Sequence, residues 1–261
     1  MDLGLAGKRA LVVGASRGLG AAIARTLLQE GATVVAAARN AGTLAGWIDA
    51  LPPDQRARVE AITVDLADIA TVDTLVEALR ARGGVDILIG NSGGPPPGEA
   101  RDTSRGDWLM HFEAMAANLF HLVQGLLPHM TERGWGRIVT IASSGVEQPI
   151  PRLVVSNAVR AAVVGWSKTL AAEVASQGVT VNVVLPGRIH TERVDQLDAA
   201  AAARTGTTRD AVAKSAIGAI PAGRYGRPEE FADVVTFLAS ARASYVTGAK
   251  IRIDGGLIRG L

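Results

Sequence analysis

The sequence predicts a single α/β domain over residues 1–261, built on a doubly wound parallel sheet with helices on both faces. Three observations support this fold class. Short runs rich in β-branched residues alternate with longer stretches of helical periodicity. The predicted strands are apolar throughout, which is typical of parallel sheets covered on both sides. Hydrophobic residues make up 48% of the chain, enough for one large core.

The predicted elements follow one another in strict alternation. Strands are expected at 9–14, 33–39, 59–66, 85–90, 136–143, 179–187 and 249–256. Helices are expected at 19–31, 71–82, about 108–133, 154–173 and 228–240. The Ala-rich piece 198–220 is the one shift in composition, and we interpret it as a helical insertion within the domain. Right-handed crossovers between such strands place ligands at their carboxyl ends.

Composition and charge narrow the classes of function. The net charge is only +2, and the Lys and Arg residues are scattered among 25 acids, so we expect no nucleic-acid partner. The absence of Cys excludes disulfides and thiolate chemistry and is compatible with a cytoplasmic location. No apolar run has the length of a membrane helix, and the N-terminus does not look like a signal peptide. Because the histidines have no acid cluster at ligand spacing, we expect no metal site.

A Gly-rich turn, GASRGLG at residues 14–20, lies between the first predicted strand and the first predicted helix. Its glycines let the backbone approach a pyrophosphate, and the helix N-terminus supplies N–H donors to it. This placement predicts a dinucleotide site rather than an ordinary tight turn. The turn residues assigned to the cofactor are Gly14, Ser16, Arg17, Gly18, Leu19 and Gly20.

The end of the second predicted strand indicates which dinucleotide is bound. A site that prefers NAD carries an acid there, which binds the ribose 2′-hydroxyl and repels a phosphate. Here the chain offers Ala38 and Arg39, and Arg17 lies in the Gly-rich turn. Two guanidinium groups suit a 2′-phosphate, because Arg binds phosphate in a bidentate way. We therefore predict NADP(H); the alternative is that Arg39 is a solvated charge at a strand end.

Together with further motifs, these residues resemble the short-chain dehydrogenase/reductase family over nearly the whole chain, which implies a Rossmann-like fold and a nicotinamide dinucleotide. The family's Gly-rich turn begins here with Val13-Gly14, and its NNAG motif is similar to GNSG at 90–93. ANLF carries the family's helix Asn at Asn118, IVTIASS contains its catalytic Ser at Ser143, and PGRIHT matches its PGxIxT motif. Beyond the turn, the resemblance assigns to the cofactor Asp65, Leu66, Asn91, Gly93, Pro186, Gly187, Ile189 and Thr191.

One part of the family pattern is missing. In the family, the catalytic Ser is followed thirteen residues later by a Tyr, and that Tyr four residues later by a Lys. From Ser143, these two positions fall on Ser156 and Arg160, although the surrounding helix resembles the family's closely. Both tyrosines of the chain match other parts of the pattern. The expected catalytic set is therefore Asn118, Ser143, Ser156 and Arg160, with Arg160 also holding the cofactor.

The replacement separates cofactor binding from proton transfer. The family's Lys lowers the Tyr pKa from about 10, so that the phenol can exchange a proton with the substrate. A Ser hydroxyl is a much weaker acid. Arg160 can hold the ribose and supply positive charge, but with a pKa above about 12 an ordinary Arg passes no protons. Losing general acid–base help costs roughly 10²–10⁴-fold in rate.

Three functions remain open at this point. In the first, the chain is an oxidoreductase that acts on a carbonyl or hydroxyl group, such as that of a 3-oxoacyl substrate, and uses a non-standard proton donor. Glu147 and His190 are the candidates for a substitute acid. The alternatives are that Glu147 is a solvated loop charge and that His190 caps a helix. Alternatively, the protein binds NADP(H) without redox activity, as a sensor or scaffold. The third alternative is a repurposed pocket with non-redox chemistry.

The expected substrate is a small molecule, and segment 188–227 is its loop or lid. This segment carries six arginines: Arg188, Arg193, Arg204, Arg209, Arg224 and Arg227. These arginines would suit an acidic or phosphopantetheine-bearing substrate. The alternative is that they are ordinary solvated charges on helices, which bind no ligand. The family resemblance implies a homo-tetramer or dimer formed through the long helices around Asn118 and Lys168, with the C-terminal segment 255–261 against it.

Overall fold

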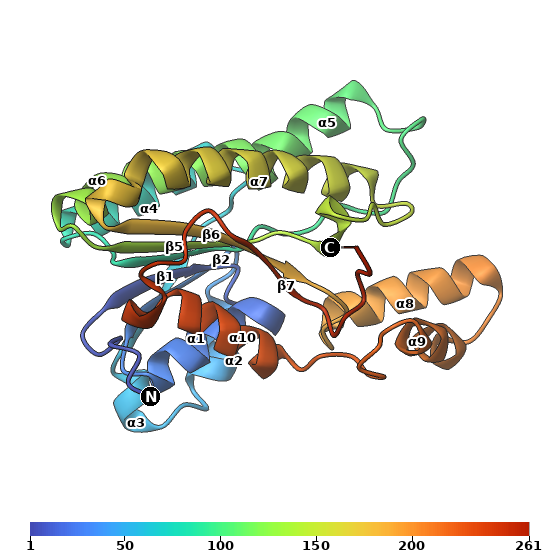
Figure 1. The fold of residues 1–261 in the computed structure, drawn as a ribbon, viewed down its shortest axis with the longest axis horizontal. Helices are drawn as coiled ribbons and strands as arrows, with labels where there is room; N and C mark the ends of the chain where they lie inside the picture. The colour runs from blue at the N-terminus through green and yellow to red at the C-terminus, as the bar shows by residue number, and fades with distance from the viewer. Residues whose placement is uncertain (261) are drawn as a thin grey trace.

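The sheet has seven parallel strands in the order β3-β2-β1-β4-β5-β6-β7 (Figure 1). A computed structural model describes residues 1–260, and Leu261 lies outside the described part. The strands are β1 (Arg9–Val13), β2 (Thr33–Ala38), β3 (Val59–Thr63), β4 (Ile87–Gly90), β5 (Gly136–Ile141), β6 (Val179–Pro186) and β7 (Lys250–Ile253). The strand order reverses between β1 and β4, which pair directly. The predicted doubly wound fold is confirmed, and this reversal is the point where such folds bind ligands.

Helices cover both faces of the sheet. In Figure 1, α1, α2 and α10 lie on one face, and α4, α6 and α7 lie on the other. The main helices are α1 (Gly18–Gln29), α4 (Ile69–Ala81), α5 (Arg105–Phe112), α6 (Asn118–Glu132), α7 (Val154–Val174), α8 (Glu192–Thr205), α9 (Arg209–Gly218) and α10 (Pro228–Leu238). None of the helices within residues 1–260 combines the length and apolar character that crossing a bilayer requires.

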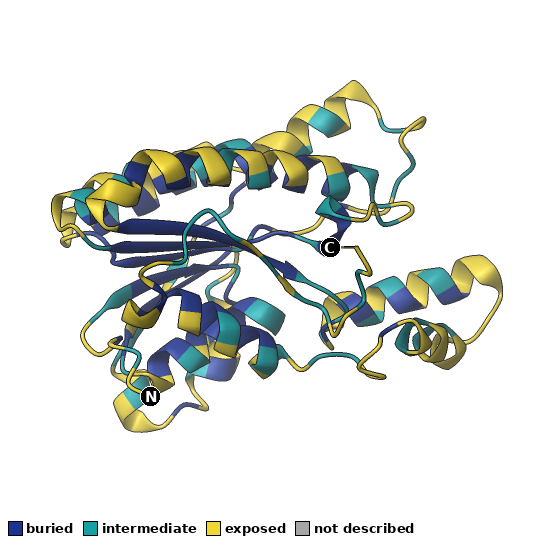
Figure 2. Ribbon diagram, in the orientation of Figure 1, coloured by how far each residue is buried: buried dark blue, intermediate teal, exposed yellow. Residues whose placement is uncertain are grey.

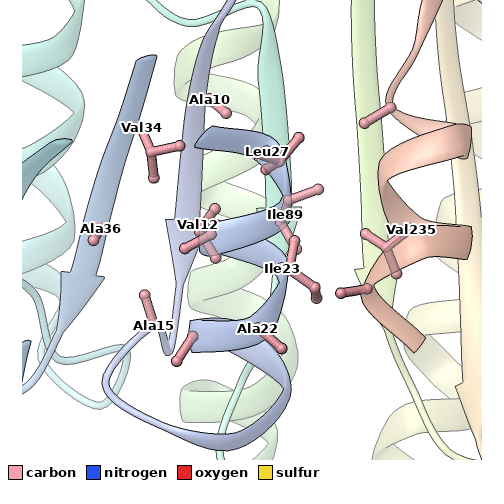
Figure 3. Packing of buried hydrophobic residues seen from close by; sticks show 14 of the residues in the cluster. Ala10, Val12, Ala15, Ala22, Ile23, Leu27, Val34, Ala36, Ile89 and Val235 are labelled. Carbon is pink, nitrogen blue, oxygen red and sulfur yellow. The ribbon is translucent and has the colours of Figure 1, made fainter. Parts of the chain in front are cut away.

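The core on the α1 face is built from small and branched side chains (Figure 3). Val12 of β1, Ile23 and Leu27 of α1, and Val235 of α10 are all fully buried. Burying each such side chain contributes about 1.5–3 kcal/mol. A second cluster, centred on Leu75, Leu122 and other residues of α4 and α6, fills the opposite face. The two clusters hold the strands rigidly, so that their carboxyl ends can position a site.

Two segments differ from the sequence expectation, and a third, the Ala-rich insertion, is helical as predicted. The short helices α2 (Gly42–Ile48) and α3 (Pro53–Arg56) were not predicted, because each spans two turns or fewer. The helix expected at 108–133 is α5 and α6 joined by a π-helical segment, Glu113–Ala117. The Ala-rich insertion consists of α8 and α9, which project beyond the sheet in Figure 1 and are largely exposed in Figure 2. Gly206, with φ of 65°, ends α8 in the left-handed conformation that favours Gly.

Candidate active and cofactor site

The Gly-rich turn between β1 and α1 is a cradle that has no room for side chains. Gly14 and Gly18 have φ of 67° and 56°, which favours Gly at both positions. A Cβ atom at Gly20 would lie 2.2 Å from the carbonyl oxygen of Gly14. Ser16 and Leu19 are half-buried beside these glycines. The backbone therefore opens toward a ligand at the N-terminus of α1, where a phosphate binds well.

Two polar side chains fix the walls of this cradle. Asn91, just after β4, donates from Nδ2 to the carbonyl oxygen of Gly14 at 3.3 Å. Trp47 of α2 donates from Nε1 to the carbonyl oxygen of Ala15 at 3.0 Å. Sequence reasoning missed Trp47, and its only signal was a lone Trp in an otherwise unassigned stretch. Both side chains thus bind carbonyl oxygens of the turn and tie it to β4 and α2.

The edge expected to hold the adenosine end contains two arginines and an acid. Arg39, after β2, is exposed and pairs with no acid within residues 1–260. Arg17 pairs with Glu192 of α8 at 2.8 Å. After β3, Asp65 accepts a hydrogen bond from the Ala67 N–H at 3.0 Å. Of the two arginines predicted to bind phosphate, Arg39 thus has no acid partner in the described chain, whereas Arg17 is engaged by the first residue of α8.

Asn118 begins α6 directly after the π-helical segment. Its side chain is buried and donates from Nδ2 to the carbonyl oxygen of Leu66 at 2.8 Å. Leu66 is itself buried and belongs to the segment that leaves β3. π-Helical turns inside α-helices are frequent at functional sites. Asn118 therefore joins the helix that flanks the site to the loop expected to cover the adenine.

Ser143 and Ser156 carry the hydroxyl groups of the site. Ser143 follows β5, and its Oγ accepts a hydrogen bond from the Gly145 N–H at 3.0 Å, so that its own hydrogen is free to be donated. Ser156 lies in the first turn of α7 and is 8% exposed; its hydroxyl has no partner within the described chain. Asn157, next in α7, exchanges hydrogen bonds with the backbone of Ile150. These bonds hold the loop after Ser143 against the start of α7.

Arg160 is one helical turn beyond Ser156 and links three elements. Its Nη1 donates to the carbonyl oxygen of Ile141 on β5 at 2.8 Å. Its Nη2 donates to the carbonyl oxygens of Ser92 at 3.1 Å and Gly93 at 3.2 Å, both just after β4. Burial, and secondly the charge of Arg193, lower the pKa of Arg160 to about 10. The guanidinium is thus a buried cation held by main-chain dipoles, at the ends of the two strands beside the switch point.

The PG turn leads from β6 into the lid. Gly187 is packed so closely that a Cβ there would lie 2.6 Å from the Cα of Asp254. Ile189 is buried in the main core, so any contact it makes with a ligand comes from its backbone. A Cβ at Gly18 would lie 3.4 Å from Thr191, which precedes α8. The lid therefore begins directly on the Gly-rich turn, with Pro186 at the strand end that it leaves.

Comparison with known proteins decides what this arrangement is. A family model described as enoyl-(acyl carrier protein) reductase matches residues 14–258. The 3-oxoacyl-[acyl-carrier-protein] reductase of Salmonella typhimurium is 35% identical over 96% of this chain and 97% of its own. The chain belongs to the short-chain dehydrogenase/reductase family.

Solved structures of the family superpose closely on the chain. L-Sorbose reductase from Gluconobacter frateurii, complexed with NADPH and L-sorbose, has a TM-score of 0.93 and 33% identity, with full coverage of both chains. The NADPH-dependent reductase YwfH, involved in bacilysin biosynthesis, has a TM-score of 0.92 and 27% identity, covering 98% of this chain and all of its own. The predicted fold of the short-chain dehydrogenase/reductase family is therefore confirmed.

Neither tyrosine stands in for the one that the short-chain reductase pattern places at position 156. Tyr225 donates to Asp198 of α8 at 2.8 Å, and Asp198 is also bound by Arg188 at 2.5 Å. Burial, followed by the hydrogen bond and charge of Asp198, raises the pKa of Tyr225 to about 12. Tyr245 is fully exposed. Tyr225 instead lines a cavity of about 440 Å³ inside the lid, between α8, α9 and its own loop.

The two substitute acids are placed differently. Glu147 is bound by Lys250 at 2.9 Å and Arg252 at 3.4 Å, both on β7. His190 is 68% exposed, and its Nε2 lies 3.8 Å from Asp195. No cluster of three or more potential metal ligands occurs within residues 1–260. Of the two acids, only His190 lies on the lid side of the site.

Proposed function

We propose that this short-chain reductase relative is an NADP(H)-dependent oxidoreductase that acts on a carbonyl or hydroxyl group of a small molecule. The observation that carries the proposal is the glycine cradle at the switch point, on the same edge of the sheet as Ser143 and separated from it by β4 alone. Similar proteins, among them a 3-oxoacyl-[acyl-carrier-protein] reductase and an L-sorbose reductase solved with NADPH, support the same reaction type. When bound, the nicotinamide supplies or accepts the hydride.

The cofactor residues follow from the cradle. The backbone from Gly14 to Gly20 suits the pyrophosphate, and Asn91 binds the carbonyl oxygen of Gly14. Arg39 is free to bind a 2′-phosphate, and Arg17 joins it once released by Glu192. Asp65, Leu66, Gly93 and the Pro186–Thr191 turn complete the proposed set.

Proton transfer rests on hydroxyl groups rather than on a phenol. Ser143 has its hydrogen free to donate, because its oxygen already accepts from Gly145. Ser156 lies in the first turn of α7, where the helix dipole favours negative charge on an oxygen. The positive charge of Arg160, one helical turn after Ser156, also favours negative charge on an oxygen at this place. These groups stabilise a developing alkoxide, and a water molecule or His190 supplies the proton.

A second candidate function is NADP(H) binding without redox chemistry. The observation that favours it concerns Arg160, which donates its hydrogen bonds to three backbone carbonyl oxygens. In the family, the Lys at this position binds the cofactor's ribose and assists the catalytic Tyr. NADPH fluorescence titration, with NADH as the comparison, measures binding alone. NADPH oxidation in the presence of a broad carbonyl panel measures turnover. Binding with a 2′-phosphate preference but no oxidation of NADPH supports this candidate; turnover with any carbonyl eliminates it.

The double variant Ser156→Tyr with Arg160→Lys tests the site directly. If the site is a reductase pocket, restoring the family's pair raises kcat by roughly 10²–10⁴-fold with a carbonyl substrate. The matched control is Ser176→Tyr with Arg204→Lys, two exposed positions where the same residue changes should leave kcat unchanged. A stable double variant that binds NADPH but gains no activity contradicts the reductase proposal.

Substrate and assembly are finer proposals on the same basis. A 3-oxoacyl thioester is one carbonyl substrate to include in the panel. A homo-tetramer or dimer is supported by the exposed side chains of Leu109, Met110 and Phe112 on α5, which are 54%, 53% and 43% exposed. Light scattering after size-exclusion chromatography measures the assembly; a monomer at micromolar concentration contradicts it. The cytoplasmic location stays a prediction.

A further inference from the structure

The arginines of the lid are not equivalent. Of the six in segment 188–227, four are neutralised by carboxylates and Arg204 is exposed at the end of α8. The pairs are Arg188 with Asp198, Arg209 with Asp195, and Arg224 and Arg227 with Glu230. Arg193 has no carboxylate partner in the part of the chain that the structure describes; its one hydrogen bond goes to a backbone carbonyl. Its neighbour Glu192 is engaged by Arg17 instead.

The guanidinium of Arg193 lies against the loop that follows β4. Its Nη2 donates to the carbonyl oxygen of Pro95 at 2.9 Å. A Cβ at Gly94 would lie 3.2 Å from Nη2 and 3.6 Å from both Cζ and Nε, so the guanidinium lies close over this glycine. Arg193 therefore reaches from the lid to the opposite wall of the site. The residue remains exposed, with N–H donors left over for an incoming ligand.

A second unneutralised guanidinium approaches the same loop from inside the protein. Arg160 donates to the carbonyl oxygens of Ser92 and Gly93, the two residues before Gly94. Segment 92–95 thus has a cation on each side, and no carboxylate within residues 1–260 pairs with either one. The mutual effect is repulsive, since the charge of Arg193 helps to lower the pKa of Arg160. Two like charges in a partly buried site favour an anion beside them.

The proposed cofactor assignment gives the phosphates to other groups: the pyrophosphate to the glycine cradle at the N-terminus of α1, and the 2′-phosphate to Arg39. Because β4 pairs with both β1 and β5, segment 92–95 lies between the glycine cradle and the strand end that carries Ser143. An anion there belongs to the molecule whose carbonyl group is placed at Ser143.

We propose that Arg193 binds an oxyanion of the substrate, a carboxylate or a phosphate, and thereby selects anionic carbonyl compounds. The proposal rests on the proposed function and names the substrate class of that site. A guanidinium fork matches both oxyanions in a bidentate way. The charge of Arg160 adds to the attraction from behind the loop. A bound anion also holds the N-terminus of α8 against segment 92–95, which closes the lid over the reacting carbonyl.

The first test does not depend on turnover. Thermal unfolding of the NADPH-saturated protein is measured with panels of oxo acids and of their methyl esters, for the natural chain and for Arg193→Gln. Oxo acids should raise the Tm of the natural chain and esters should not, and Arg193→Gln should lose the effect. The matched control Arg204→Gln removes the same charge from the same helix and should keep it. Equal shifts for acids and esters exclude a carboxylate as the ligand; if acetoacetyl-coenzyme A also gives equal shifts for Arg193→Gln and the natural chain, the proposal is overturned.

The second test uses kinetics and separates the two oxyanions. Arg193→Gln should reduce kcat/KM for the preferred anionic substrate roughly 10–100-fold, mainly through KM, with less than about 3-fold change for a neutral ester. Arg193→Lys should recover part of this loss. A preference for oxo acids over their esters indicates a carboxylate. A preference for acetoacetyl-coenzyme A over its N-acetylcysteamine thioester, lost in Arg193→Gln, indicates a phosphate. Preference for neither overturns the proposal.

Two outcomes distinguish this proposal from the proposed function. Carbonyl turnover that is indifferent to charge and to Arg193 leaves the reductase function standing and overturns the role of Arg193. Anion binding that depends on Arg193, without turnover of any carbonyl compound, supports the role of Arg193 and contradicts the reductase function. The NADPH dissociation constant should change less than twofold in Arg193→Gln. A tenfold weaker NADPH affinity would instead place Arg193 on the cofactor and overturn the substrate role.

Discussion

Gly20→Ala tests whether the glycine cradle is the cofactor site. The added Cβ would lie 2.2 Å from the carbonyl oxygen of Gly14, whereas real Cβ atoms keep at least 3.0 Å, so the turn and α1 must separate by about 0.8 Å. Overpacking of this kind costs about 1–3 kcal/mol, against a gain of up to about 1 kcal/mol from the helix propensity of Ala. We expect the free energy of unfolding to fall by about 1–2 kcal/mol.

The same displacement should weaken cofactor binding more clearly than it weakens the fold. The N–H groups at the start of α1 move relative to Gly14, and we expect an NADPH dissociation constant raised by about tenfold or more, equal to about 1.4 kcal/mol. Urea unfolding and NADPH fluorescence titration measure the two effects. Gly46→Ala is the matched control, since Gly46 lies within α2 with no atom within 4 Å of its Cβ position. That variant should be about 0.5–1 kcal/mol more stable, with unchanged affinity. If Gly20→Ala behaves like Gly46→Ala, the cradle is not the binding site.

Three further predictions concern charged and polar groups. Arg39→Asp should weaken NADPH binding roughly 10–100-fold in fluorescence titration while leaving NADH binding equal or stronger; equal losses for both would contradict the 2′-phosphate role. Tyr225→Phe should lower the free energy of unfolding by about 1–2 kcal/mol, because the hydrogen bond to Asp198 is lost. The kcat should stay within about twofold, because the pKa of Tyr225 is raised to about 12 and the phenol is held by Asp198. A kcat loss of about 10²-fold would instead identify Tyr225 as the proton donor. The hydrogen bonds from Arg224 and the Arg227 N–H lower the pKa of Glu230 to about 2, so its stabilising contribution is complete above pH 4.5 and disappears as the pH falls toward 2. Urea midpoints should therefore be lower for Glu230→Gln than for the natural chain at pH 6 and nearly equal near pH 2, and a gap that does not change with pH would refute this linkage.

The sequence was sufficient for the fold because its information is local and repeated. Each apolar strand and each amphipathic helix is recognisable by itself, and right-handed crossovers then determine how the strands are ordered. The position of Ser143 at the end of β5, and of the Gly-rich turn before α1, follows directly from that order. The prediction that the site lies at the carboxyl ends of the strands needed no side-chain geometry.

The hydrogen-bond and ion-pair partners of the charged side chains could not be predicted from the sequence. Arg160 binds carbonyl oxygens on two different strand ends, up to 68 residues away in the chain, and no periodicity encodes such contacts. Likewise, Arg188 and Arg193 look alike in the sequence, yet only Arg188 meets an acid. That difference depends on how the lid folds back on itself. The choice between an ordinary surface charge and a ligand-binding charge therefore required the structure.

The π-helical segment before Asn118 sets the angular phase between two halves of one continuous helix. Because each residue of an α-helix turns the chain by about 100°, one residue accommodated in a wider turn rotates everything after it relative to everything before it. A single wheel drawn through Trp108 and Asn118 would therefore place these side chains on the wrong relative faces. Deleting one residue between Glu113 and Ala117 would turn Asn118 away from Leu66 without changing any residue of the site. In this family member, one extra residue in a helix decides which side of α6 faces the loop that follows β3.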